Sequence, residues 1–186
     1  AEYLDFVEEI KKRGKAATSE MIIPLPGETK ETYFEGIEFL MEHNIQPGTY
    51  TLMMLDGAEL GRDAAIKRFG MKGKWRILPK QFGKYNGKKV FETEQACIET
   101  NTMSFDDYIE CRNYSFILRL ISSQSFLPIY KLAKQLNISW FEVSKKLSEL
   151  VQDKNFKGKL KNIFDGFCKE SQNELFETQK EAMDFL

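Results

Sequence analysis

Two short apolar runs and one helical pattern organise the first third of the chain. Residues 18–25 read Thr-Ser-Glu-Met-Ile-Ile-Pro-Leu, and residues 49–55 read Thr-Tyr-Thr-Leu-Met-Met-Leu. Short apolar runs between turn residues are typical of strands that are buried on both faces. Between the runs, and again over about residues 3–10, apolar positions recur at helical spacing. The pattern therefore predicts the order helix, strand, helix, strand.

Short connections join these four elements. Pro24 should end the first strand, because proline cannot donate the next hydrogen bond of a ladder. Thr29 is the expected N-cap of the following helix, and a turn at residues 46–48 should lead into the second strand. Strands and helices that alternate with short connections form parallel sheets with helices outside them. We expect an α/β fold with too few elements to close a barrel.

The rest of the chain divides into an irregular part and a helical part. Glycine and proline interrupt residues 62–100, where Asn86-Gly87 favours a hairpin turn between short strands. Helical periodicity then continues to the C-terminus. We therefore predict three parts: the end of an α/β unit at 1–61, a basic irregular connector with a β-hairpin at 62–103, and an α-helical domain at 104–186.

Charge is distributed unevenly along this chain of net charge −1. Residues 62–90 contain ten Lys or Arg and one acid, whereas residues 91–110 contain six acids and no base. Aromatic residues are interleaved with the basic ones, so this stretch could hold a phosphorylated substrate or single-stranded nucleic acid. The alternative interpretation of this basic stretch is a solvated surface arm whose charge is neutralised by the acids that follow it. The candidate substrate contacts are Lys72, Lys74 and Arg76.

The remaining chemistry of the sequence is sparse. Cys97, Cys111 and Cys168 are too far apart in sequence for a disulfide framework or a zinc or iron-sulfur site, and we expect buried thiols. With a single histidine, His43, we assign no catalytic residue and no metal ligand. No stretch approaches the roughly 20 apolar residues that span a bilayer, and the start of the chain lacks a secretory signal, so we expect a cytoplasmic protein without a membrane span.

One segment resembles a known enzyme family. Residues 20–29 read Glu-Met-Ile-Ile-Pro-Leu-Pro-Gly-Glu-Thr, and residues 55–60 read Leu-Asp-Gly-Ala-Glu-Leu. Together they resemble radical S-adenosylmethionine (SAM) enzymes, above all those with a cobalamin-binding domain. In that family a late barrel strand ends in a Gly-Leu-Pro-Gly-Glu-Thr-like turn and the next strand in a Gly-Thr-x-Leu-like segment. Here Pro24 replaces the first glycine and Ala58 replaces the threonine.

The resemblance covers about residues 1–100 and carries implications for the fold. It implies the C-terminal part of an incomplete radical SAM barrel, which is TIM-like with parallel strands, followed by an α-helical extension. It also implies SAM as a cofactor, with Ile22 or Ile23 packing its adenine and with Met54 and Leu55 bordering the same pocket. The full set of candidate cofactor contacts is Ile22, Ile23, Pro24, Gly27, Glu28, Met54 and Leu55.

The family also needs a 4Fe-4S cluster held by a Cys-x3-Cys-x2-Cys loop. This sequence has no such loop, and the family places it after the first barrel strand, upstream of this region. The implied parent enzyme would perform radical methylation, cyclisation or rearrangement on a small molecule, an anionic one if the basic stretch binds it, and could use cobalamin. This chain alone should not cleave SAM. Its implied partner is the N-terminal part of the same enzyme.

A competing interpretation comes from the helical part. Residues 132–139, with Ala133 at a crossing and Asn137 in a turn, resemble a DNA-binding helix-turn-helix. The next helix would offer Trp140 and Phe141 at its start, which suits packing better than a phosphate-lined groove. The alternative function is thus a helical interaction module that binds protein or nucleic acid, with nucleic acid the less favoured partner.

Overall fold

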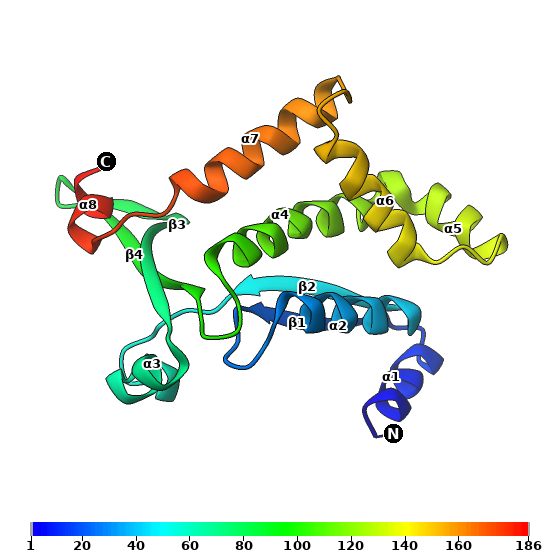
Figure 1. Ribbon diagram of the computed structural model, residues 1–186, viewed down its shortest axis with the longest axis horizontal. Helices are drawn as coiled ribbons and strands as arrows, with labels where there is room; N and C mark the ends of the chain where they lie inside the picture. Colours follow the sequence, from blue (N-terminus) through cyan, green and yellow to red (C-terminus); the bar gives the residue numbers. More distant parts are fainter. Residues whose placement is uncertain (1, 186) are drawn as a thin grey trace.

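The computed structural model describes residues 2–185, which form eight α-helices and two small sheets (Figure 1). The elements are α1 (Glu2–Lys12), β1 (Ala17–Ile23), α2 (Lys30–Glu42), β2 (Ile45–Thr51), α3 (Asp63–Phe69), β3 (Lys72–Tyr85), β4 (Lys88–Glu99), α4 (Phe105–Ile121), α5 (Leu127–Gln135), α6 (Trp140–Gln152), α7 (Lys159–Asn173) and α8 (Gln179–Asp184). The mixed α/β class and the helical C-terminal half are as predicted. The described residues form no closed barrel.

The first sheet is the predicted parallel pair. β1 and β2 pair in register from Ala17 opposite Ile45 to Ile23 opposite Thr51. Because side chains alternate along a strand, Met21, Ile23 and Thr51 share one face of this sheet. Met21 packs against Gly36 of α2, and the hydroxyl of Tyr108 in α4 lies 3.3 Å from that of Thr51. Helices α2 and α4 therefore cover this face, and both run alongside the strands in Figure 1.

The opposite face of the sheet has a different character. It carries Thr18, Glu20, Ile22, Gln46, Gly48 and Tyr50, all of them exposed or half-buried. We call these six residues the open face. The prediction of strands buried on both faces is thus wrong for the described residues. The sequence of β1 still looks continuously apolar, because Met21, Ile22 and Ile23 follow one another. In the strand, however, Ile22 points to the opposite face from the other two.

The second sheet is an antiparallel hairpin of β3 and β4. Asn86 and Gly87 form its turn with φ of 49° and 82°, as a type I′ turn requires, and this confirms the predicted hairpin. Its strands are longer than expected, so the segment predicted as an irregular connector is regular over most of its length. The sequence also gave no prediction of α3, which ends at Gly70 in the left-handed conformation.

Hydrogen bonds join the hairpin to the parallel pair just past the end of β2. The amide of Leu52 donates to the carbonyl of Ile23 (2.7 Å), and the amide of Cys97 donates to the carbonyl of Leu52 (2.8 Å). Met54 likewise donates to Gln95 in β4. A small apolar cluster of Leu52, Met54, Met71 and Cys97 seals this junction. The carboxyl end of the parallel pair is therefore the point where the two sheets meet.

The helical half does not fold apart from the strands. α4 buries Tyr108, Cys111, Tyr114 and Leu118. The main core combines residues of β1 and α2 with residues of α4, α6 and α7, namely Ile23, Tyr33, Ile37, Ile117, Phe141, Val151 and Phe164. Each such side chain contributes about 1.5–3 kcal/mol on burial.

The second strand differs from its prediction in position. β2 begins at Ile45 and ends at Thr51, so Pro47 and Gly48 lie inside the strand and not in a turn before it. A proline is tolerated there because β2 has a strand on one side only over these residues. Residues 52–54 then pair with β4, as described above.

Candidate functional site

The candidate cofactor residues gather at the carboxyl end of the parallel pair. Ile22 and Ile23 end β1 and Pro24 follows it, while Met54 and Leu55 follow β2. The hydrogen bond between Leu52 and Ile23 holds the two ends side by side. In open parallel sheets this end is where loops converge on a ligand.

Alternation along β1 separates the two isoleucines. Ile23 is 2% exposed and belongs to the main core under the helices, and Pro24 is fully buried as well. Ile22 lies on the open face and packs beside the Leu52 and Met54 cluster. Of the two candidates for an adenine contact, Ile22 is the less buried one and lies on the sheet face opposite α2.

Gly27 and Glu28 shape the turn after β1. Gly27 has φ of +88°, a conformation that favours glycine. The Glu28 carboxylate accepts a hydrogen bond from the Thr32 hydroxyl at 2.9 Å, while its carbonyl accepts one from Thr102 at 2.7 Å. Thr29 caps α2 as predicted. The acid therefore holds the turn in place.

The loop after β2 presents one apolar side chain to solvent. Met54 is 9% exposed, whereas Leu55 is 52% exposed. Gly61 passes so close that a Cβ atom there would lie 2.0 Å from the Leu55 carbonyl oxygen. Only glycine permits this approach, so the loop at 55–61 folds back on itself and displays Leu55. Leu55 therefore presents apolar surface to solvent next in sequence to Met54, which shares its apolar cluster with half-buried Ile22.

The open face contains residues that sequence reasoning did not single out. Glu20 is exposed, and the Tyr50 ring lies over Gly48, the residue opposite Glu20. A carboxylate thus stands next to an aromatic ring on the sheet face opposite α2. The signal was present in the sequence, since Thr18, Glu20 and Ile22 alternate with Ser19, Met21 and Ile23.

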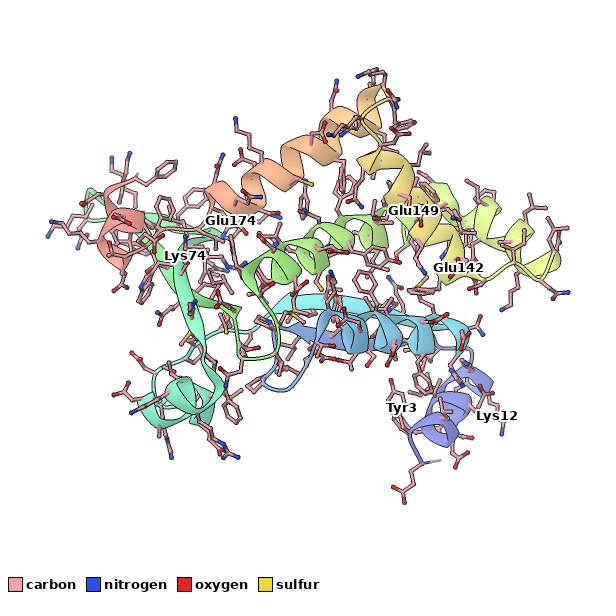
Figure 2. The ribbon with its side chains drawn as sticks, in the orientation of Figure 1. Tyr3, Lys12, Lys74, Glu142, Glu149 and Glu174 are labelled. Carbon is pink, nitrogen blue, oxygen red and sulfur yellow. The ribbon has the colours of Figure 1, made fainter. Side chains whose placement is uncertain are left out.

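The basic candidates are paired with acids. Lys72 lies 2.6 Å from Glu99, and Lys74 lies 2.7 Å from Glu177. Arg76 bonds to Glu94 and lies 3.7 Å from Glu174, which also binds Arg112 at 3.0 Å. Figure 2 shows Glu174 at the end of α7 close to the hairpin strand that carries Lys74. These pairs neutralise the base of the hairpin, and the prediction of an anionic substrate at these three residues gains no support.

The cysteines have the character of packed thiols. Cys97 and Cys111 are buried as predicted, and burial raises their pKa to about 11 and about 12. Burial also raises the pKa of half-buried Cys168. Thiols that stay protonated are poor nucleophiles and poor metal ligands. No group of three His, Cys, Asp or Glu that could hold a metal occurs among residues 2–185.

The helix-turn-helix-like segment forms α5, a turn and α6. Asn137 has φ of 54° in the turn, and Ala133 is buried at the crossing. At the start of α6, Phe141 is 4% exposed in the main core, and Trp140 packs edge-on against Tyr130. The side chains that would enter a DNA groove are used for packing instead.

Within residues 2–185, none of the helices has the length and apolar character needed to cross a membrane. No protein-family model matches this sequence, and no curated protein matches it. The functional argument therefore rests on the residues described above.

Proposed function

We propose that this chain is the C-terminal part of a radical SAM enzyme and contributes one side of the SAM and substrate pocket. The observation that carries the proposal is the parallel pair with helices on one face, an open face on the other and the Pro-Leu-Pro-Gly-Glu-Thr turn at its carboxyl end. A segment of an α/β barrel has this form, because its helices lie outside and its other face points into the barrel.

The residues at the carboxyl end fit part of a SAM site. Ile22 and Leu55 provide apolar surface for the adenine, and the Gly27 turn lets backbone approach the ligand. The cysteines do not fit the cluster, since they are buried or half-buried and protonated. When bound to its cluster in the complete enzyme, SAM supplies a 5'-deoxyadenosyl radical. The role of this chain is to bind and orient the nucleoside and to line the substrate chamber with the open face.

The test uses the complete polypeptide that contains this chain, reconstituted with iron and sulfide under anaerobic conditions. Formation of 5'-deoxyadenosine from SAM is measured for the wild type and for Leu55→Asp. We expect the variant to lower kcat/KM for SAM by about tenfold or more, because a carboxylate replaces an apolar ring contact worth about 1.4 kcal/mol. Leu150→Asp is the matched control, since Leu150 is 46% exposed on α6, and it should match the wild type.

Two results would overturn the proposal. One is a complete polypeptide that lacks a three-cysteine loop or forms no 5'-deoxyadenosine above background. The other is an equal effect of Leu55→Asp and Leu150→Asp. A helical interaction module stays the alternative, and salt-sensitive binding to generic duplex DNA in a gel shift would favour it.

A further inference from the structure

The far end of the hairpin differs in charge from its base. Residues 80–91, which we call the hairpin tip, contain four lysines and no acid. No ion pair among the described residues involves Lys80, Lys84, Lys88 or Lys89, although the basic residues at the base of the hairpin are all paired. The tip is therefore a concentrated positive charge that its own molecule leaves uncompensated.

The cross-strand pairs of the hairpin tip combine like charges with exposed aromatic rings. Lys84 lies directly opposite Lys89, an arrangement of like charges that destabilises a hairpin. Next to them Phe82 pairs with Phe91, and the ring of Phe82 is 77% exposed. An apolar hollow of about 650 Å³ lies along the same segment. Exposed aromatic surface between unpaired cations is suited to a partner that is both acidic and apolar.

A groove with that chemistry lies on the helical side of this same chain. It has a volume of about 560 Å³ between α2, α4 and α6, and Phe34, Ile109 and Phe141 contribute apolar surface to it. Its acids outnumber its two lysines and are Glu31, Glu35, Glu38, Asp106, Glu110 and Glu149. We call this the acidic groove. Figure 2 shows Glu149 on α6, one of the three helices that form it.

Several polar groups of the acidic groove lack partners of their own. Glu31, Glu35, Glu38 and Asp106 take part in none of the ion pairs formed within residues 2–185. The side-chain oxygen of Asn113, which also lines the groove, is buried without a hydrogen-bond donor in the described part of the chain. Lysine ammonium groups of a partner would neutralise the unpaired acids.

We propose that the hairpin tip of one chain docks in the acidic groove of a second copy. Charge and apolar character are complementary between the two surfaces, and Phe82 is the expected anchor in the groove. Figure 1 places the hairpin and α6 at different ends of the molecule. The hairpin tip of one copy would therefore dock in the groove of another copy and not in its own. This proposal is independent of the enzymatic one.

The test is sedimentation velocity of this chain from low to high micromolar concentration at low salt. We expect the average mass to rise with concentration and to fall as salt is added, because exposed charges are screened. Lys84→Glu combined with Lys89→Glu should weaken association by about tenfold or more, as should Glu35→Lys combined with Glu38→Lys. Lys131→Glu with Lys154→Glu is the matched control, since both lysines are exposed and lie outside the hairpin tip and the acidic groove, and it should associate like the wild type.

Mixing the tip variant with the groove variant is the decisive arm. The groove variant keeps the wild-type tip and the tip variant keeps the wild-type groove, so these two unchanged surfaces should dock with each other. The mixture should therefore associate more strongly than either variant alone. The proposal is overturned if the wild type stays monomeric, if the tip variant associates normally, or if the mixture stays monomeric. A monomeric chain whose tip lysines are needed to bind oligo(dT) would assign the tip to nucleic acid instead.

Discussion

Two buried tyrosines on neighbouring helices differ in a single contact. Tyr33 in α2 is fully buried, and its hydroxyl has no hydrogen-bond partner among the described residues. Tyr114 in α4 is also buried, but its hydroxyl bonds to that of Ser144 in α6. Burial raises the pKa of Tyr114 to about 12 and that of Tyr33 further still. Comparing the two positions therefore separates what a buried hydrogen bond contributes to the free energy of unfolding from what a buried ring contributes.

We expect Tyr114→Phe to lower the free energy of unfolding by about 1 kcal/mol, because it leaves the Ser144 hydroxyl with one partner fewer. Tyr33→Phe should leave this free energy unchanged or raise it, because it removes a buried hydroxyl that bonds to nothing in the protein. Urea unfolding followed by circular dichroism measures both. A loss at Tyr33 as large as at Tyr114 would mean that a buried water satisfies the Tyr33 hydroxyl.

At the scale of elements, the start of α4 is bound to α2. Ser104 caps α4, and its hydroxyl donates to the Asp107 carboxylate at 2.6 Å. Lys30 of α2 lies 3.0 Å from Asp107 and 2.9 Å from Glu110. The Ser104 hydroxyl first, and then the Lys30 ammonium, lower the pKa of Asp107 below its usual value of 3.8. This junction also positions the helices that cover the parallel pair.

Lowering the pH should therefore destabilise the folded state by protonating Asp107. A carboxyl whose pKa is lower in the folded state stabilises that state above its unfolded pKa, and this contribution disappears as pH falls through the folded pKa. We expect Asp107→Asn to lose stability at neutral pH and to converge with the wild type once the pH has fallen below the folded-state pKa of Asp107. Thermal unfolding across this pH range measures the difference.

Ser104→Ala should cost about 1 kcal/mol at neutral pH through the lost cap. Thr178→Ala, at the cap of the short peripheral helix α8, is the comparison and should cost less in global unfolding. If the difference in stability between the wild type and Asp107→Asn were the same at every pH, the pH dependence could not be assigned to Asp107.

The sequence predicts the elements best where a local signal decides them. Thr29 marked a helix start and Asn86-Gly87 marked a hairpin turn, because caps and type I′ turns depend on adjacent residues. Pro47 misled the placement of β2, since its tolerance depends on whether a neighbouring strand exists, which no local pattern encodes.

The candidate site divides in the same way. The turn and the strand ends were found from the motif, whereas the separation of Ile22 from Ile23 needed to know which face α2 covers. The pairing of Lys74 with Glu177 and of Arg76 with Glu174 was equally out of reach, because these two acids follow α7 and are about a hundred residues away in sequence.

At the scale of the whole molecule, strands and helices share their stabilising contacts. The main core includes side chains from β1, α2, α4, α6 and α7. The hairpin is tied to the chain after α7 by a pair of backbone hydrogen bonds between Trp75 and Phe176, at 2.8 and 2.7 Å. The three-part division predicted from the sequence therefore describes segments that depend on one another for burial.

Two tryptophans allow this dependence to be measured. Trp75 lies in the hairpin and Trp140 at the start of α6, so Trp140→Phe leaves a reporter in one region and Trp75→Phe leaves one in the other. We expect the fluorescence transitions of both variants in urea to coincide with their own transitions by circular dichroism, since one shared core unfolds in one step. Two separated midpoints would instead support an independent helical domain.

The one-sided covering of β1 also has a consequence for genetics. In a library selected only for a folded chain, Ala17, Met21 and Ile23 should resist change, while Thr18, Glu20 and Ile22 accept many substitutions. Under the proposed enzymatic function, a library of the complete polypeptide selected for product formation should lose that freedom at the second set of positions. Comparing the substitutions that survive each selection would show, position by position, which side chains of this strand are needed for function and which are needed only for folding.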